Sequence, residues 1–186
     1  MRIAWLGPFA AASALAEHGA AVAAVLARSC ELEIWTEDLG PLVQTTLPVR
    51  RYSDPDSLAA ADVVFYTLAE EVSAPPPGVR PGIVILARAL GTVSAAPPAA
   101  LGVVTHFSSD LAALTQGRLE PVVALEPEPV EAYGAALLEF LERALRSAPA
   151  LELLDRLGGE LAAMGATPNL GVYDAIASDF GRFLLL

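Results

Sequence analysis

The opening segment of the chain constrains the fold more than any other part. Residues 1–6 have the apolar composition of a short buried strand, which ends at Gly7. An alanine-rich stretch over about residues 13–28 favours a helix, and residues 31–36 favour a second strand. A strand, a glycine-containing turn, a helix and a second strand make up a βαβ unit, in which the turn after the first strand faces the ligand. The segment therefore predicts a ligand-facing loop over residues 7–12.

The same alternation continues along most of the chain. Further strands are expected at residues 47–52, 62–67, 82–87, 101–105 and 121–125, with a short helix at 54–61 and another capped by Ser108 or Ser109. After Pro129 the pattern becomes helical, at 130–146, 151–164 and about 173–183. Strands that alternate with helices are typical of a parallel sheet. We expect an α/β fold, a three-layer sandwich with a mostly parallel Rossmann-like sheet and C-terminal helices packed on it. One domain would cover residues 1–186, with a helical tail from about residue 130.

Composition narrows the classes of partner. The 186 residues are 54% hydrophobic and 18% charged, which is enough to bury one sizeable core. The formal net charge is -11, and all 11 basic residues are arginines. An acidic surface repels phosphate backbones and anionic lipids, so we expect no nucleic-acid partner. The lack of lysine removes the phosphate-binding lysine of a Walker motif and any Schiff-base chemistry. No apolar run approaches the roughly 20 residues of a transmembrane helix, so no membrane span is predicted.

Two features bear on the cellular compartment. Cys30 is the only cysteine, so neither an internal disulfide nor a cysteine-based zinc site can form. Arg2 and the apolar run after it resemble a secretory signal, but Glu17 and His18 follow at once and the helical pattern continues to Arg28. That continuation fits a mature βαβ unit better than a cleaved leader. We therefore expect a cytoplasmic protein.

The loop after the first strand lacks the fingerprint of a dinucleotide site. That fingerprint needs Gly-x-Gly-x-x-Gly, so that backbone amides approach a pyrophosphate at a helix N-terminus. Here Gly7 stands alone, and Pro8 removes an amide. Glu37 and Asp38 end the second strand, where a ribose-binding acid would lie, but acids are frequent at strand ends. A nicotinamide cofactor is disfavoured, and we predict no cofactor.

His106 is the best placed of the two histidines. It follows a strand and precedes a helix, so it belongs at the carboxyl edge of the sheet, where open α/β sheets bind ligands. There it could act as a general base or a hydrogen-bond donor to a sugar or phosphate. The favoured interpretation is a histidine packed at the edge of the core and satisfied by a backbone carbonyl. His18 is expected in mid-helix, as a surface or sheet-facing residue.

The sequence predicts neither a catalytic triad nor a metal site. No serine lies in a Gly-x-Ser-x-Gly motif, and no third group completes a triad with either histidine. Glu120, Glu126 and Glu128 straddle a strand punctuated by prolines, so they are interpreted as an acidic strand margin. No cluster of Asp, Glu and His has metal-ligand spacing.

Several segments, taken in order, carry a resemblance to a known family. They are the opening from Met1 to Phe9 with its proline-containing turn, the helix start from Ser13 to His18, and residues 31–36, 61–66, 81–86, 103–108 and 155–165. Together they make most of the chain similar to the N-terminal, acceptor-side domain of retaining family 4 glycosyltransferases of the GT-B fold. The resemblance implies a Rossmann-like half of a two-domain enzyme that uses a nucleotide sugar.

The chain departs from that family at three points. Ala14 replaces the glycine after the serine, which crowds the loop that admits acceptor and donor phosphates. Ala87 and Arg88 replace a His-Asp pair after the strand at 82–87. The chain has about half the length of such an enzyme, and the second domain, with its nucleotide-sugar site and Glu-x7-Glu motif, has no counterpart. Glu120 and Glu128 share that spacing, but they belong to the first-domain pattern.

Two functional hypotheses follow from the resemblance and these departures. The first is a glycosyltransferase-like single domain that does not catalyse transfer by itself. It would act as a binding or interaction module, paired as a homodimer or with a separate glycosyltransferase subunit. A mean hydropathy of +0.51 supports a buried contact surface. The alternative is a nucleotide-sugar-dependent glycosyltransferase, active as a homo-oligomer or with a partner subunit. A nucleotide-binding Rossmann module of another kind is a third, less favoured hypothesis. The expected ligand-binding residues are Gly7, Pro8, Ser13, Arg88, His106 and Ser108.

Overall fold

A computed structural model describes seven segments of the chain. They are residues 1–9, 13–37, 40–43, 45–69, 75–87, 100–116 and 120–163, with the backbone alone at Pro55 and residues 150–163. The chain divides into two compact units, Met1–Leu145 and Arg146–Leu186. The sheet and the candidate site belong to the first unit. That residues 1–186 form one domain stays a prediction.

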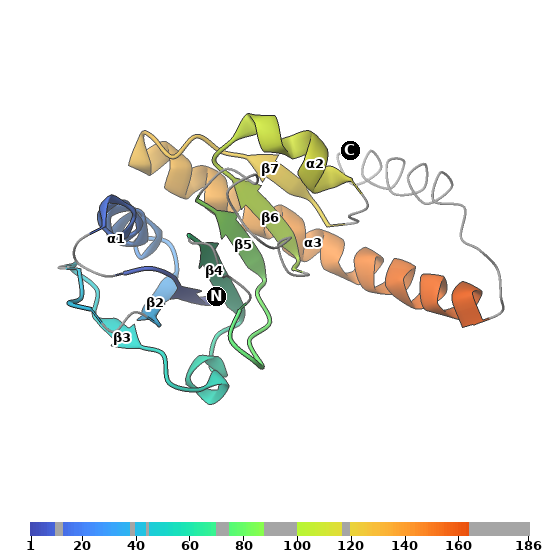
Figure 1. Ribbon diagram of the computed structural model, residues 1–186, viewed down its shortest axis with the longest axis horizontal. Coiled ribbons are helices and arrows are strands. Elements are labelled where there is room, and N and C mark those ends of the chain that lie inside the picture. The colour runs from blue at the N-terminus through green and yellow to red at the C-terminus, as the bar shows by residue number, and fades with distance from the viewer. Residues whose placement is uncertain are drawn as a thin grey trace. The chain divides into compact units, whose positions relative to one another are not determined.

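The described residues of the first unit form one all-parallel sheet of seven strands (Figure 1). The strands are β1 (Arg2–Leu6), β2 (Glu31–Thr36), β3 (Val49–Arg51), β4 (Val63–Leu68), β5 (Ile83–Leu86), β6 (Gly102–Thr105) and β7 (Val122–Ala124). Their order is β3-β2-β1-β4-β5-β6-β7, so the direction of winding reverses between β1 and β4. In open α/β sheets, ligands bind at the carboxyl ends of the strands beside such a reversal. The predicted α/β class with a parallel Rossmann-like sheet is confirmed.

The first face of the sheet is covered by two helices. Successive side chains of a strand point to opposite faces, so Trp5, Phe65 and Ile85 lie on the same face. Helix α1 (Ala14–Leu26) packs on this face mainly through small residues, and helix α3 (Val130–Ala163) packs on it through residues before 146. The buried contacts from α1 and α3 are Ala16, Ala20, Val22, Ala23, Leu26, Tyr133, Leu137, Phe140, Leu141 and Ala144. This layer positions the candidate site.

The second face carries a separate apolar cluster. Leu6, Tyr66 and Leu86 are among the strand residues buried there. Short elements contribute the rest: Leu58 comes from the 3-10 helix η1 (Pro55–Leu58), and Leu114 from the five-residue helix α2 (Leu111–Thr115). The two clusters on opposite faces account for a three-layer sandwich.

Two short helices differ from their predicted form. The helix expected at residues 54–61 is η1, a 3-10 helix of four residues whose first turn is closed by Asp54, since Asp54 Oδ1 accepts from the Ser57 N–H at 3.1 Å. Ser108 does not cap an α-helix. It begins a second 3-10 helix, η3 (Ser108–Asp110), which places Asp110 at the N-cap of α2, and neither helix start has a side-chain cap hydrogen bond. The prediction that Ser108 or Ser109 caps the helix was wrong, because the 3-10 turn displaces both hydroxyls from the cap position.

The helical tail also differs from the prediction. Two helices were expected, at 130–146 and 151–164, whereas the structure has one helix, α3, with Pro149 inside it. A proline costs about 3 kcal/mol in a helix interior through one lost hydrogen bond and a steric clash. The alanines and leucines on either side favour the helix strongly enough to continue through it. The helix expected near 173–183 lies outside the described residues.

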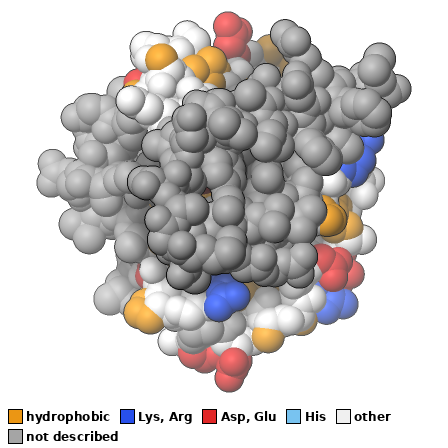
Figure 2. Space-filling view, turned by 90° about the vertical axis from the view of Figure 1, so that its right-hand side faces the viewer, with side chains coloured by type: hydrophobic (Ala, Val, Ile, Leu, Met, Phe, Trp, Pro, Cys, Tyr) orange, Lys and Arg blue, Asp and Glu red, His pale blue; other side chains and the backbone are white. Residues whose placement is uncertain are grey.

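The face of the described part that is visible in Figure 2 carries charges of both signs. In the space-filling view, acidic and arginine side chains lie along the visible margin, with single apolar side chains between them (Figure 2). Within the described segments, no helix is both long and apolar enough to cross a membrane.

Candidate functional site

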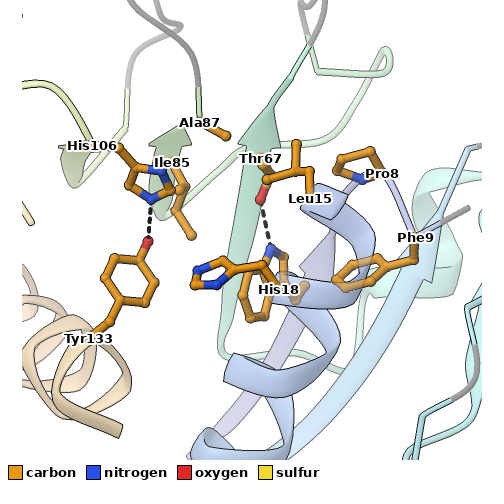
Figure 3. A pocket seen from close by; sticks show the side chains of 11 residues that line it. Pro8, Phe9, Leu15, His18, Thr67, Ile85, Ala87, His106 and Tyr133 are labelled. Carbon is orange, nitrogen blue, oxygen red and sulfur yellow. Dashed lines mark hydrogen bonds between the residues drawn. The ribbon is translucent and has the colours of Figure 1, made fainter. Parts of the chain in front are cut away.

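The carboxyl ends of the central strands enclose a small cavity with two helices (Figure 3). Its lining comes from the β1 strand and turn, from α1, from the ends of β4, β5 and β6, and from α3. The lining residues are Trp5, Pro8, Phe9, Leu15, His18, Gly19, Thr67, Ile85, Ala87, His106 and Tyr133. The cavity volume is about 20 Å³, which is room for roughly one water-sized group. The cavity lies beside the point where the strand order reverses.

The turn after β1 is filled from within by Phe9. The Phe9 side chain is only 2% exposed, and its ring meets the Trp5 ring edge to face at 5.7 Å between centroids. A Cβ placed on Gly7 would lie 3.2 Å from Phe9 Cε2, and one on Gly19 would lie 3.0 Å from Phe9 Cε1. Such contacts are tighter than ordinary packing allows, so both glycines make room for this ring. The space beneath the turn is therefore occupied by an aromatic side chain.

The backbone amides of this turn are already engaged or missing. The Gly7 N–H donates to the Trp35 carbonyl at 3.0 Å, and the Phe9 N–H donates to the Gly7 carbonyl at 3.0 Å. Pro8 has no N–H. A phosphate at a βα turn is normally held by free backbone amides of this kind. Residues 7–9 offer none.

Trp5 and Thr67 form the floor of the cavity. The Trp5 indole N–H donates to the Thr67 hydroxyl at 2.8 Å, and this bond is buried between β1 and β4. Trp5 also meets Phe65 edge to face, at 6.2 Å between centroids. The bond satisfies the indole N–H and holds the Trp5 ring against β4.

Three rings form the polar wall of the cavity (Figure 3). His106 follows β6, Tyr133 lies in the first turn of α3, and His18 lies on α1. The ring centroids are 5.3 Å apart for His106 and Tyr133, 5.8 Å for His18 and Tyr133, and 6.4 Å for the two histidines. We call these three residues the ring cluster. It joins both covering helices to the end of a central strand.

Within the ring cluster, His106 and Tyr133 share a hydrogen bond. His106 Nε2 lies 3.0 Å from the Tyr133 hydroxyl. Burial lowers the pKa of His106 to about 4, with a further contribution from the nearby His18. Burial also raises the pKa of the Tyr133 phenol. Both groups are therefore neutral near pH 7.

The two ring nitrogens of His18 have different surroundings. Its Nδ1 lies 3.4 Å from Glu128 Oε1, and the Glu128 side chain is 70% exposed. Its Nε2 is buried and has no hydrogen-bond partner among the described residues. A buried polar atom without a partner costs about 1–3 kcal/mol, so it needs an explanation.

The structure brings some of the predicted ligand-binding residues together and separates others. Pro8 and His106 line the cavity, and Gly7 contacts the Phe9 ring that lines it. Ser13 lies at the N-cap of α1, half-buried, with no side-chain cap bond and outside the cavity lining. Ser108 is exposed in η3 and does not line the cavity. Arg88 lies outside the described residues.

Sequence reasoning missed the partners of His106. A backbone carbonyl was expected to satisfy it, whereas the structure places the Tyr133 phenol there. Tyr133 had a local signal, because it is an aromatic residue in the first turn after Pro129. His18 also had a local signal. It follows Leu15 by three positions in the predicted helix, so both residues lie on the face of α1 that lines the cavity. The contact of His18 with Glu128 spans 110 positions, and no pattern in one sequence gives it.

Neither a search for metal-binding groups nor comparison with known proteins assigns a function to the site. Within the described segments, no group of three or more His, Cys, Asp and Glu side chains could hold a metal ion. No family model matches the chain, and no curated protein or solved structure matches it either. The resemblance to family 4 glycosyltransferases therefore rests on the sequence segments alone.

Proposed function

We propose that this chain is a glycosyltransferase-like binding module that does not catalyse sugar transfer by itself. The observation that carries the proposal is the filled turn after β1. Phe9 occupies the space beneath Gly7, and residues 7–9 offer no free amide to a phosphate. The parallel sheet and its carboxyl-edge cavity agree with one Rossmann-like half of a GT-B enzyme, and a cavity of about 20 Å³ has no room for a nucleotide sugar.

The proposal includes a partner and a compartment. In a GT-B enzyme the reaction takes place between two domains, so a single half needs a second body opposite its carboxyl edge. We propose a second copy of this chain or a separate glycosyltransferase subunit in that place. The cytoplasm is the proposed compartment, on the sequence argument that Glu17 and His18 continue a helix rather than end a leader.

Thermal denaturation with nucleotides tests the central part of the proposal. The full chain is melted alone and with millimolar UDP, GDP, ADP and their glucose conjugates. Binding to the native state alone raises the melting temperature. We expect no rise with any of the six. A rise that saturates with concentration, or release of nucleoside diphosphate from a conjugate above a protein-free blank, would overturn the proposal.

The second candidate is a nucleotide-sugar-dependent glycosyltransferase that is active as a homo-oligomer or with a partner subunit. One observation favours it, because His106 is grouped with His18 and Tyr133 at the edge of the sheet where substrates bind. Size-exclusion chromatography followed by the same nucleotide assay separates the candidates. An oligomer whose melting temperature rises with a nucleotide sugar supports the enzyme. An oligomer without that rise supports the binding module.

A further inference from the structure

We propose that the ring cluster binds a small primary ammonium group in the carboxyl-edge cavity. The proposal names a ligand for the edge on which the proposed binding function rests. Ammonium binding depends on the polar wall of the cavity, whereas the lack of nucleotide binding depends on the turn after β1. Either proposal can therefore fail without the other.

The hydrogen-bonding groups of the ring cluster favour a ligand that donates. The Nδ1 of His18 faces the Glu128 carboxylate, which only accepts, so the network assigns the imidazole proton to Nδ1. The buried Nε2 then carries a lone pair, and no described residue forms a hydrogen bond with it. The Tyr133 oxygen also keeps a lone pair, whichever tautomer His106 adopts. Two acceptors on neighbouring rings suit a ligand that donates.

The charges near the cavity favour a positively charged ligand. Among the described residues that line the cavity there is no Asp, Glu, Lys or Arg, and Glu128 is the carboxylate beside His18. The whole chain carries a formal charge of -11. A phosphate or carboxylate would be repelled, and an uncharged alcohol would gain nothing from this field. A cation is favoured.

The volume of the cavity and the aromatic rings in its wall favour a small cation. About 20 Å³ accommodates one group the size of water or ammonium, which excludes a guanidinium or a quaternary amine. Five of the lining residues have aromatic rings: Trp5, Phe9, His18, His106 and Tyr133. Aromatic rings attract cations electrostatically, most strongly where water is displaced. Because Glu128 is exposed and its charge is screened, we expect millimolar binding.

A thermal-shift titration with matched small ligands tests the proposal on the full chain at pH 8. Methylammonium chloride is the probe, and methanol matches its shape without charge. Tetramethylammonium chloride matches its charge without an N–H donor, and sodium chloride corrects for salt. At ten times its dissociation constant, methylammonium should raise the melting temperature by about 3–5 °C. The three controls should give no saturable rise.

Two variants locate the binding. His18→Phe keeps a ring and removes the acceptor nitrogen, and Tyr133→Phe removes the phenol oxygen. Each is compared with its own ligand-free melting temperature, so a change in basal stability does not enter. We expect His18→Phe to abolish the methylammonium shift and Tyr133→Phe to weaken binding by about tenfold. If one variant fails to fold, the other decides.

Several outcomes would overturn the proposal. They are the absence of a saturable shift with methylammonium, an equal shift with methanol or tetramethylammonium, or a full shift in a folded His18→Phe or Tyr133→Phe variant. A water molecule that satisfies Nε2 without exchanging for an ammonium group gives the first outcome. None of these results bears on the nucleotide assay.

Discussion

The carboxyl edge of this sheet has two adjoining parts that differ in how they are filled. At the turn after β1, the Phe9 ring fits against two glycines and the neighbouring amides are bonded or missing. At the ring cluster, two neutral groups share a hydrogen bond, while His18 Nε2 is buried without a partner in the described part of the chain. The turn after β1 is filled by packing, whereas the ring cluster contains a buried polar atom that still needs a hydrogen-bond partner. The difference is the basis for proposing that a ligand binds at the histidines rather than at the turn.

The largest effect is expected from emptying the filled turn after β1. Phe9→Ala removes a buried ring and leaves a cavity, which should lower the free energy of unfolding by about 3–5 kcal/mol. Urea denaturation measures the loss. Phe107→Ala is the matched control, because Phe107 is 37% exposed and its loss should cost much less. Similar costs for both variants would contradict the packing assigned to Phe9.

A double-mutant cycle sharpens the same point. Gly19→Ala puts a Cβ 3.0 Å from the Phe9 ring, and we expect a loss of about 1–2 kcal/mol from overpacking. In the Phe9→Ala background the ring is absent, so the same change should stabilise the protein by about 0.5–1 kcal/mol through helix propensity. Denaturation of the four proteins gives the coupling. Equal effects of Gly19→Ala in both backgrounds would show that Phe9 and Gly19 do not contact.

The hydrogen bond of the ring cluster should contribute less. Tyr133→Phe keeps the ring and its packing but removes the phenol that pairs with His106. The free energy of unfolding should fall by about 1 kcal/mol. Tyr52→Phe is a useful comparison, since none of the described residues forms a hydrogen bond with the buried Tyr52 hydroxyl. That change should cost nothing or stabilise the protein, and an equal loss in both variants would argue against the His106 bond.

The ring cluster also predicts a pH dependence of stability. The pKa of His106 is about 4 in the folded protein and about 6.5 in the unfolded chain. Between these values the unfolded chain binds the proton and the folded protein does not, so stability falls as the pH is lowered through this window. His106→Gln retains a group that can bond to Tyr133 but does not titrate. The variant should lose stability less steeply between pH 6.5 and 4, and identical slopes would contradict the low pKa.

The sequence predicted the sheet well because its signal is local. Apolar runs such as residues 62–67 and 82–87 lie within one residue of β4 and β5, since a strand buried on both faces needs a continuous apolar run. The prediction of separate helices at 130–146 and 151–164 was wrong, because the helix formers around Pro149 continue one helix through it. Local composition therefore predicts where strands and helices occur. It predicts their ends poorly where a helix breaker lies among helix formers.

The candidate site was only half predictable for the opposite reason. The place of His106 follows from strand order, since a residue after a parallel strand lies at the carboxyl edge. Its contacts depend on how α1 and α3 lie over the sheet, and these come from packing between distant segments. The Phe9 ring was missed because its fit depends on Gly19, a residue on the next helix. Tertiary contacts of this kind leave no spacing in a single sequence.

NMR titration of the full chain most directly tests which part of the carboxyl edge binds a ligand. Amide and histidine side-chain resonances are followed as UDP, and then methylammonium, is added to millimolar concentration. The account predicts saturable shifts at His18 and Tyr133 with methylammonium and no saturable shift at Gly7 or Phe9 with UDP. Saturable shifts at Gly7 and Phe9 with UDP would show that the turn binds phosphates and would contradict the account.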